Sequence, residues 1–108
     1  MVYTIDEIRQ IITPIAKKYG LPAVYLFGSY ARGTANEDSD VDLIIDTEGT
    51  QLKTLLKLGE LYNEFEGALG KQVDLITVSS LQQRPQVPSD EVFRDTVWKE
   101  RVNIYDAA

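Results

Sequence analysis

Apolar residues recur along the chain with two different spacings, and the change of spacing divides it into helices and strands. Five of them, Ile5, Ile8, Ile12, Ile15 and Tyr19, repeat at the spacing of a helix with one apolar face. Residues 23–27 instead form a short apolar run with β-branched and aromatic members, which is typical of a buried strand. Over the whole chain this pattern predicts helices at 4–19, about 50–66 and 90–101, and strands at 23–27, 40–46, 71–78 and 102–105.

Capping and breaking residues mark the ends of the first helix. Thr4 and Glu7 have the spacing of a capping box, and Gly20 follows the last apolar residue of the pattern. Pro14 lies inside the pattern and removes one backbone hydrogen bond. We therefore expect the first helix to kink or to split near Thr13.

Turn-forming residues place the remaining boundaries. Residues 29–32 are expected to form one helical turn, and 33–39 and 79–89 are expected to be loops. Gly67 and Gly70 are expected to close the second long helix. In the last helix the inward side chains are expected to be Val92, Phe93, Val97 and Trp98.

This order of elements predicts the fold class. One helix is followed by a strand, a helical turn, a strand, a helix, a strand, a helix and a short strand. We expect an α/β (α+β) fold with a mixed sheet of about four strands packed by helices. At 108 residues the chain is expected to be a single domain, residues 1–108.

Composition narrows the chemistry that such a domain could perform. The chain has no cysteine and no histidine, which excludes thiolate and imidazole metal sites and Ser-His-Asp catalysis. A net charge of −6 argues against nucleic acid as the direct partner. No apolar run approaches the length of a membrane-spanning helix, so we expect a cytoplasmic protein without a membrane partner.

Two carboxylates stand where the strand at 40–46 begins. Asp40 and Asp42 are two residues apart and are expected to share one face, with ~6.5–7 Å between their Cα atoms. The residues between and after them are apolar and are expected to pack the other face. Two carboxylates at this separation can hold two Mg²⁺ ions, which lie ~3.5–4 Å apart in two-metal sites. Asp74 is embedded in the strand at 71–78 and joins them if the two strands are neighbours.

A Gly-Ser turn precedes this acidic pair by ten residues. Gly28 ends the strand at 23–27 and lets a phosphate approach the backbone, where Ser29 and the following amides can donate hydrogen bonds. Arg32 lies one turn further and could contact a triphosphate oxygen. Each of these features alone has an ordinary structural explanation as a turn, a strand end or a solvated edge. Their occurrence in this order favours a nucleotide site.

Residues 26–33 (LFGSYARG) followed by residues 39–43 (SDVDL) resemble the signature of the DNA polymerase β-like nucleotidyltransferases. The likeness is strongest to the minimal nucleotidyltransferases known as MNT antitoxins. It implies transfer of a nucleoside monophosphate from ATP to a hydroxyl, with two Mg²⁺ ions as cofactors. By this resemblance, Gly28, Ser29 and Arg32 would bind the nucleotide, and Asp40, Asp42 and Asp74 would be the catalytic and metal-binding residues.

The resemblance also implies a protein partner. Such antitoxins are associated with a helical RNase toxin of the HEPN family, in a hetero-oligomer, and add AMP to one of its tyrosines. Two alternatives remain open: a non-catalytic antitoxin that neutralises its partner by binding, and a transferase subunit that acts on a small molecule or an RNA end. Candidate docking residues are Val87, Phe93, Trp98 and Tyr105, although we favour a place in the core for Phe93 and Tyr105.

Overall fold

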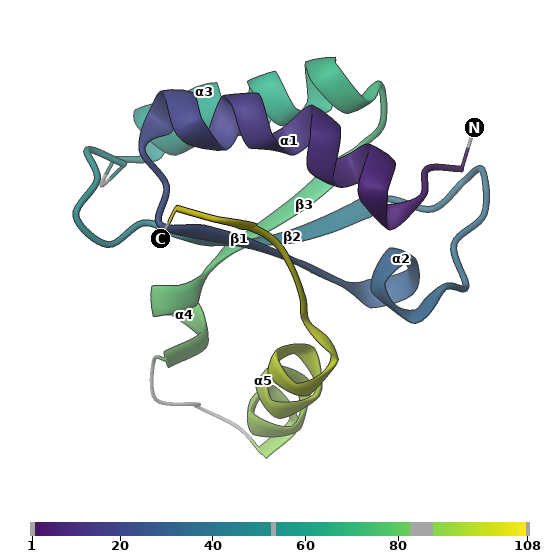
Figure 1. Cartoon of the computed structure of the whole chain (residues 1–108). Helices are drawn as coiled ribbons and strands as arrows, with labels where there is room; N and C mark the ends of the chain where they lie inside the picture. Colours follow the sequence, from purple (N-terminus) through teal and green to yellow (C-terminus); the bar gives the residue numbers. More distant parts are fainter. Residues whose placement is uncertain (1, 53, 83–87, 108) are drawn as a thin grey trace.

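The computed structural model describes residues 2–52, 54–82 and 88–107. The elements are helices and strands in the order predicted, with one additional short helix before the last long one (Figure 1). They are α1 (Ile5–Tyr19), β1 (Ala23–Phe27), α2 (Gly28–Arg32), β2 (Val41–Asp46), α3 (Leu55–Leu69), β3 (Val73–Thr77), α4 (Val78–Gln82), α5 (Pro88–Glu100) and β4 (Val102–Asp106).

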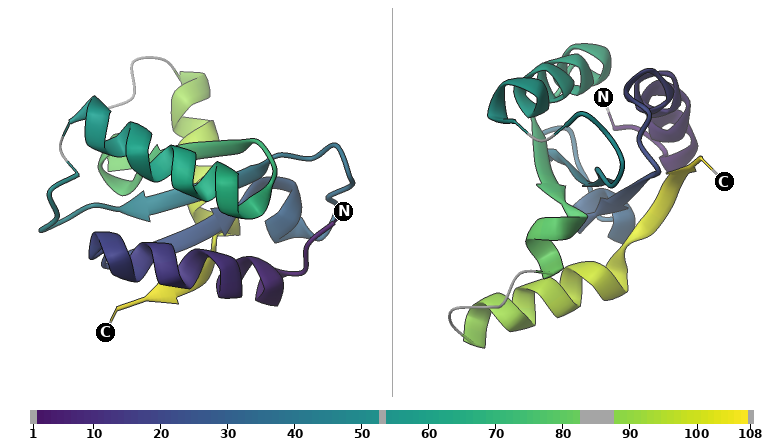
Figure 2. Two further views of the ribbon diagram at one scale, coloured as in Figure 1. Left: turned by 90° about the horizontal axis from the view of Figure 1, so that it is seen from above. Right: turned by 90° about the vertical axis from the view of Figure 1, so that its left-hand side faces the viewer.

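The four strands form one mixed sheet in the order β3-β2-β1-β4. β1 pairs antiparallel with both β2 and β4, whereas β2 and β3 run parallel. Helices α1 and α3 lie side by side on one face, and α4 and α5 lie on the other (Figure 2). The predicted fold class is confirmed.

Helix α1 begins and ends as the sequence predicts. The Thr4 side chain accepts a hydrogen bond from the Glu7 amide, and the Glu7 carboxylate accepts one from the Thr4 amide. Gly20 ends the helix in the left-handed conformation. The expected split of the helix near Thr13 is wrong, because α1 runs without interruption through Pro14. Pro14 lies on the exposed side of α1, where water can solvate a carbonyl that loses its amide partner.

The boundaries predicted for the second long helix and for the loop at 79–89 are wrong. Helix α3 begins at Leu55 rather than near residue 50, because the Thr54 side chain caps it by accepting from the Lys57 amide. The helix continues past the predicted end near residue 66 and through Gly67 to Leu69, where Gly70 caps it. The predicted loop at 79–89 begins instead as α4, whose first turn is tied by the Thr77 hydroxyl accepting from the Ser80 amide. Residues 83–87 of that predicted loop lie outside the described residues.

The sheet buries different amounts of apolar surface on its two faces. The larger cluster joins α1 and α3 to the sheet and includes Val41, Leu43 and Ile45, as expected for the apolar face of β2. The smaller cluster lies under α5 and contains Phe27, Ile44 and Val97. Ile44 therefore gives the face that carries Asp42 a core of its own.

Helix α5 contributes less to the core than its pattern predicts. Val97 is buried, but Val92 and Phe93 are 66% and 55% exposed, and Trp98 is exposed as well. The expectation that these three point into the core is wrong. The N-terminal part of α5 extends away from the sheet, and the C-terminal part lies close to it (Figure 2). No described helix is both long and apolar enough to cross a membrane.

Candidate active site

The parallel pairing of β2 with β3 brings two of the predicted carboxylates together. In its register Asp42 stands beside Asp74, so their side chains leave the same face of the sheet at neighbouring positions. Asp42 is half-buried and Asp74 is exposed. The condition that the sequence left open, that the two strands are neighbours, is met.

The surroundings of Asp42 disfavour its negative charge. Burial, together with a side-chain hydrogen bond to Asp74 and the charges of Asp74 and Asp40, raises the pKa of Asp42 to about 7. The positive charge of Arg32 acts in the opposite direction and lowers this pKa. Near neutral pH the Asp42 carboxyl therefore carries a proton for part of the time, and a cation placed there would displace it.

Gly28 is required by the acidic pair as well as by the turn. Antiparallel pairing places Phe27 opposite Asp42, and the next residue, Gly28, lies against the Asp42 side chain. A Cβ atom on Gly28 would stand 2.1 Å from Asp42 Oδ2, and its φ of +71° disfavours any residue with a side chain. Sequence reasoning attributed this glycine to an approaching phosphate and missed the carboxylate, because the pairing of β1 with β2 has no local signal.

Helix α2 fixes the segment after Gly28. Gly33 closes it with a left-handed backbone, and the Thr34 amide donates to the Ser29 carbonyl at 2.9 Å. Ser29 is half-buried at the start of this helical turn. Arg32 leaves its last turn and donates from Nη1 to Glu100 Oε2 at 3.1 Å. The predicted phosphate contact thus has a carboxylate partner, on α5, that the sequence did not reveal.

Asp40 is the third predicted carboxylate, and its negative charge acts on Asp42. It directly precedes β2 and lines a polar hollow of about 350 Å³ together with Ser39, Lys71 and Gln72. Among residues 2–52, 54–82 and 88–107, no three acidic side chains are close enough together to enclose a metal ion. The structure therefore brings Asp42 and Asp74 together and leaves Asp40 near enough to act on Asp42 by its charge alone.

The donors present nevertheless fit a magnesium ion. Carboxylate oxygens are the ligands it prefers, and it keeps waters and substrate phosphates in its shell, so few protein ligands are needed. The like charges that raise the pKa of Asp42 are the ones that a divalent cation would compensate. These residues are better suited to bind a cation that arrives together with phosphate oxygens than to form a complete metal site before the substrate binds.

Comparison with known proteins places this arrangement in a family. Residues 8–101 match the family described as Nucleotidyltransferase domain. The chain belongs to the nucleotidyltransferase family. The matched range includes the Gly-Ser turn and all three aspartates.

Two relatives of this nucleotidyltransferase cover most of its length. The protein adenylyltransferase MntA of Thermococcus cleftensis is 42% identical over 83 residues, which are 73% of this chain and 82% of that protein. A Methanocaldococcus jannaschii protein, provisionally named a protein adenylyltransferase, is 37% identical over 101 residues, which are 93% of this chain and 97% of that protein.

Solved structures show the same fold. A protein provisionally described as a minimal nucleotidyltransferase superposes with a TM-score of 0.66 at 31% identity, covering 93% of this chain and 95% of that one. A toxin–antitoxin complex with AMP-PNP gives 0.69 at 24% identity, covering 92% and 73%. A tri-AMPylated HEPN toxin of Shewanella oneidensis in complex with its MNT antitoxin gives 0.64 at 19% identity, covering 96% and 74%. The last two likenesses bear on the fold alone.

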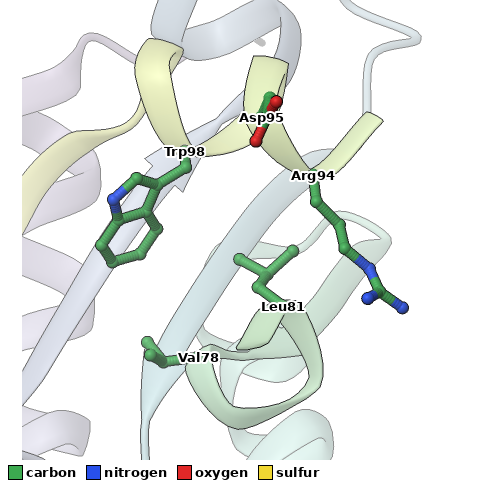
Figure 3. Close-up of a pocket in the computed structure, with 5 residues that line it drawn as sticks. All are labelled: Val78, Leu81, Arg94, Asp95 and Trp98. Atoms are coloured by element: carbon green, nitrogen blue, oxygen red, sulfur yellow. The ribbon is translucent and has the colours of Figure 1, made fainter. Parts of the chain in front are cut away.

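A second hollow of this nucleotidyltransferase lies between α4 and α5, on the face that carries Asp42. It measures about 250 Å³ and is lined by Val78 and Leu81 below and by Arg94, Asp95 and Trp98 above (Figure 3). Of the candidate docking residues, Phe93 and Trp98 are exposed, so the expected core position of Phe93 is wrong. Tyr105 packs against the larger core cluster, as expected. Val87 lies outside the described residues.

Proposed function

We propose that this nucleotidyltransferase transfers AMP from ATP to a hydroxyl, most specifically a tyrosine, of a HEPN-type RNase toxin, and thereby acts as its antitoxin. The observation that carries the proposal is the Asp42–Asp74 pair over Gly28. It is supported by the name of the 42% identical relative, a protein adenylyltransferase. It is supported further by an MNT antitoxin of the same fold, seen with an AMPylated HEPN toxin.

The proposed roles are those that the resemblance to the nucleotidyltransferase signature implies, and the positions of Asp42 and Gly28 support them. Gly28 and Ser29 would bind the triphosphate through the backbone and hydroxyl, and Arg32 would contact one of its oxygens. Asp42 and Asp74 would hold Mg²⁺ from neighbouring positions, and Asp40 would join them as a ligand when the ion binds with the nucleotide. The charge of the bound ion would compensate the attacking and leaving oxygens. Because Asp42 carries a proton for part of the time near neutral pH, binding of the nucleotide with Mg²⁺ should release that proton.

The transfer itself forms one bond and breaks one. The acceptor oxygen attacks the α-phosphorus of ATP, the bond to the β-phosphate oxygen breaks, and pyrophosphate leaves. The proton of the acceptor hydroxyl passes to a carboxylate, and we assign this role to Asp74, because it is the exposed member of the pair. The protein's own contribution is to position the nucleotide against the acceptor and to receive that proton.

The test incubates the purified chain with Mg²⁺, ATP labelled at its α-phosphate, and the helical protein encoded beside it. We expect label on that protein, and a rate at least about 100-fold lower for Asp42→Asn, since each lost charge contact is worth several kcal/mol. Asp46→Asn is the matched control. Asp46 lies on the same strand and face as Asp42 but at the opposite end of β2.

Other outcomes would assign the other functions. If the partner is neutralised equally well by Asp42→Asn, the chain acts by binding alone, and the proposed transfer is wrong. If label appears on added RNA or on a small molecule but on neither protein, the chain is a transferase with a different acceptor. If wild-type protein takes up no Mg·ATP, the nucleotide site itself is wrong.

A further inference from the structure

An ion pair links two segments that sequence reasoning treats separately. Arg32, at the end of α2, and Glu100, at the end of α5, are 68 positions apart and meet at 3.1 Å. Both side chains are partly exposed, so the ion pair by itself contributes little to the stability of the fold. The position of the ion pair matters more than its strength, because Arg32 lies close enough to Asp42 to lower the pKa of that carboxyl.

Local contacts hold the backbone next to each partner while α5 is docked. Arg32 is followed by Gly33, whose amide closes α2 on the Ser29 and Tyr30 carbonyls. Glu100 is followed by Arg101, whose guanidinium stacks 3.7 Å from the Trp98 ring and donates to the Trp98 carbonyl at 2.5 Å. The same guanidinium lies 5.4 Å from the Tyr25 ring on β1. This stack holds the end of α5 against the sheet, and with it Glu100.

The geometry leaves most of the Arg32 guanidinium available to a ligand. The pair with Glu100 uses Nη1, and a guanidinium carries five N–H donors in a planar fork. A carboxylate that holds one corner of the fork restricts its rotamers without occupying the other edge. An arginine restrained in this way loses less entropy when a phosphate binds than an unrestrained one.

We propose that Glu100 is a positioning residue, which holds the Arg32 guanidinium beside Asp42 so that its remaining donors meet the triphosphate. This inference rests on the proposed function, since it takes Arg32 as a phosphate contact. The opposite effect of the same pair would be competition, in which Glu100 occupies Arg32 and excludes the phosphate. The two differ in the sign of the change when Glu100 is removed.

The experiment measures the affinity for Mg·ATP by titration calorimetry, without an acceptor, for Glu100→Ala, Arg32→Ala and the double variant. We expect Glu100→Ala to weaken binding about three- to fivefold, within the range of an exposed pair. Arg32→Ala should weaken it about tenfold or more, because it removes a charge-assisted contact. The double variant should bind like Arg32→Ala, since Glu100 acts only through Arg32.

Two further variants separate positioning from a general structural effect. Glu64→Ala is the matched control, because it breaks the Lys18–Glu64 pair on α1 and α3 with a carboxylate of similar exposure, 33% against 35% for Glu100. Its affinity for Mg·ATP should be unchanged. Glu100→Gln keeps the acceptor oxygen and should recover part of the loss. Urea unfolding of each variant establishes that it is folded.

The inference is overturned if Glu100→Ala binds Mg·ATP as wild type does, or more tightly, as competition requires. It is also overturned if the losses of Glu100→Ala and Arg32→Ala add in the double variant. Either result, obtained with a wild-type protein that binds Mg·ATP, leaves the proposed function intact. Absence of binding by wild type would instead overturn the proposed function, and this inference with it.

Discussion

Gly28→Ala tests the contact between the turn and the acidic pair. The added methyl would stand 2.1 Å from Asp42 Oδ2 and 3.0 Å from Asp42 Cγ, so the carboxylate must move. It would also place an alanine at a φ of +71°, which costs ~1–2 kcal/mol. Gly33→Ala provides a matched comparison, because Gly33 has a φ of +77° but nothing within 4 Å of the added methyl.

The two variants therefore differ by the clash alone. We expect Gly33→Ala to lower the free energy of unfolding by ~1–2 kcal/mol. Gly28→Ala should cost about 1 kcal/mol more, at the low end of the overpacking range because the Asp42 carboxylate can swing toward solvent. The same swing separates Asp42 from Asp74, so Gly28→Ala should also lose affinity for Mg·ATP.

Urea unfolding at pH 7 measures the first effect, and a double variant isolates it. Asp42→Ala removes Oδ2 and Cγ and leaves only the Asp42 Cβ, 3.4 Å from the added methyl, an ordinary contact. In that background, Gly28→Ala should cost no more than Gly33→Ala does. Equal costs for the two single variants, or an unchanged extra cost in the double variant, would show that Gly28 is present for its backbone alone.

Three further outcomes are expected. Because the pKa of Asp42 is raised to about 7, the native state binds a proton that the unfolded state releases, so this carboxyl lowers stability as the pH rises from about 4 to 7. Asp42→Asn should remove that part of the slope and be more stable than wild type at pH 8, as urea midpoints at pH 5 and 8 would measure. Val97→Ala should cost about 2 kcal/mol in the same assay, whereas the exposed Val92→Ala and Phe93→Ala should each cost under about 0.5 kcal/mol. A larger loss for Val92→Ala than for Val97→Ala would contradict the placement of α5. Thr4→Ala should lower the free energy of unfolding by about 1 kcal/mol, because it removes the side-chain cap of α1.

Local patterns accounted for most of the elements. The short apolar run before Gly28 forms β1, and Thr4 and Glu7 form a capping box. Each of these signals is carried by residues that lie within a few positions in the sequence. The apolar neighbours of Asp74 predict the strand that contains it, but they do not predict that this strand pairs with β2. These features depend on alternation and capping, which a single segment carries.

The parts that sequence reasoning missed depend on pairs of distant segments. Neither the contact between Gly28 and Asp42 nor the pair between Arg32 and Glu100 leaves a trace in either segment alone. The exposure of Phe93 was missed for a related reason. Periodicity tells which residues share a helix face, but it does not tell how far the helix extends beyond the sheet it packs on.

The unequal thickness of the two apolar layers has a consequence for motion. Under α5 the buried cluster consists of Phe27, Ile44 and Val97 in the part of the chain that the structure describes, so little apolar surface resists local opening there. Amide hydrogens of α5 should therefore exchange with solvent through partial unfolding, well before those of α1. Each such opening carries Glu100 away from Arg32, so a molecule with α5 undocked should bind Mg·ATP about as weakly as Glu100→Ala does.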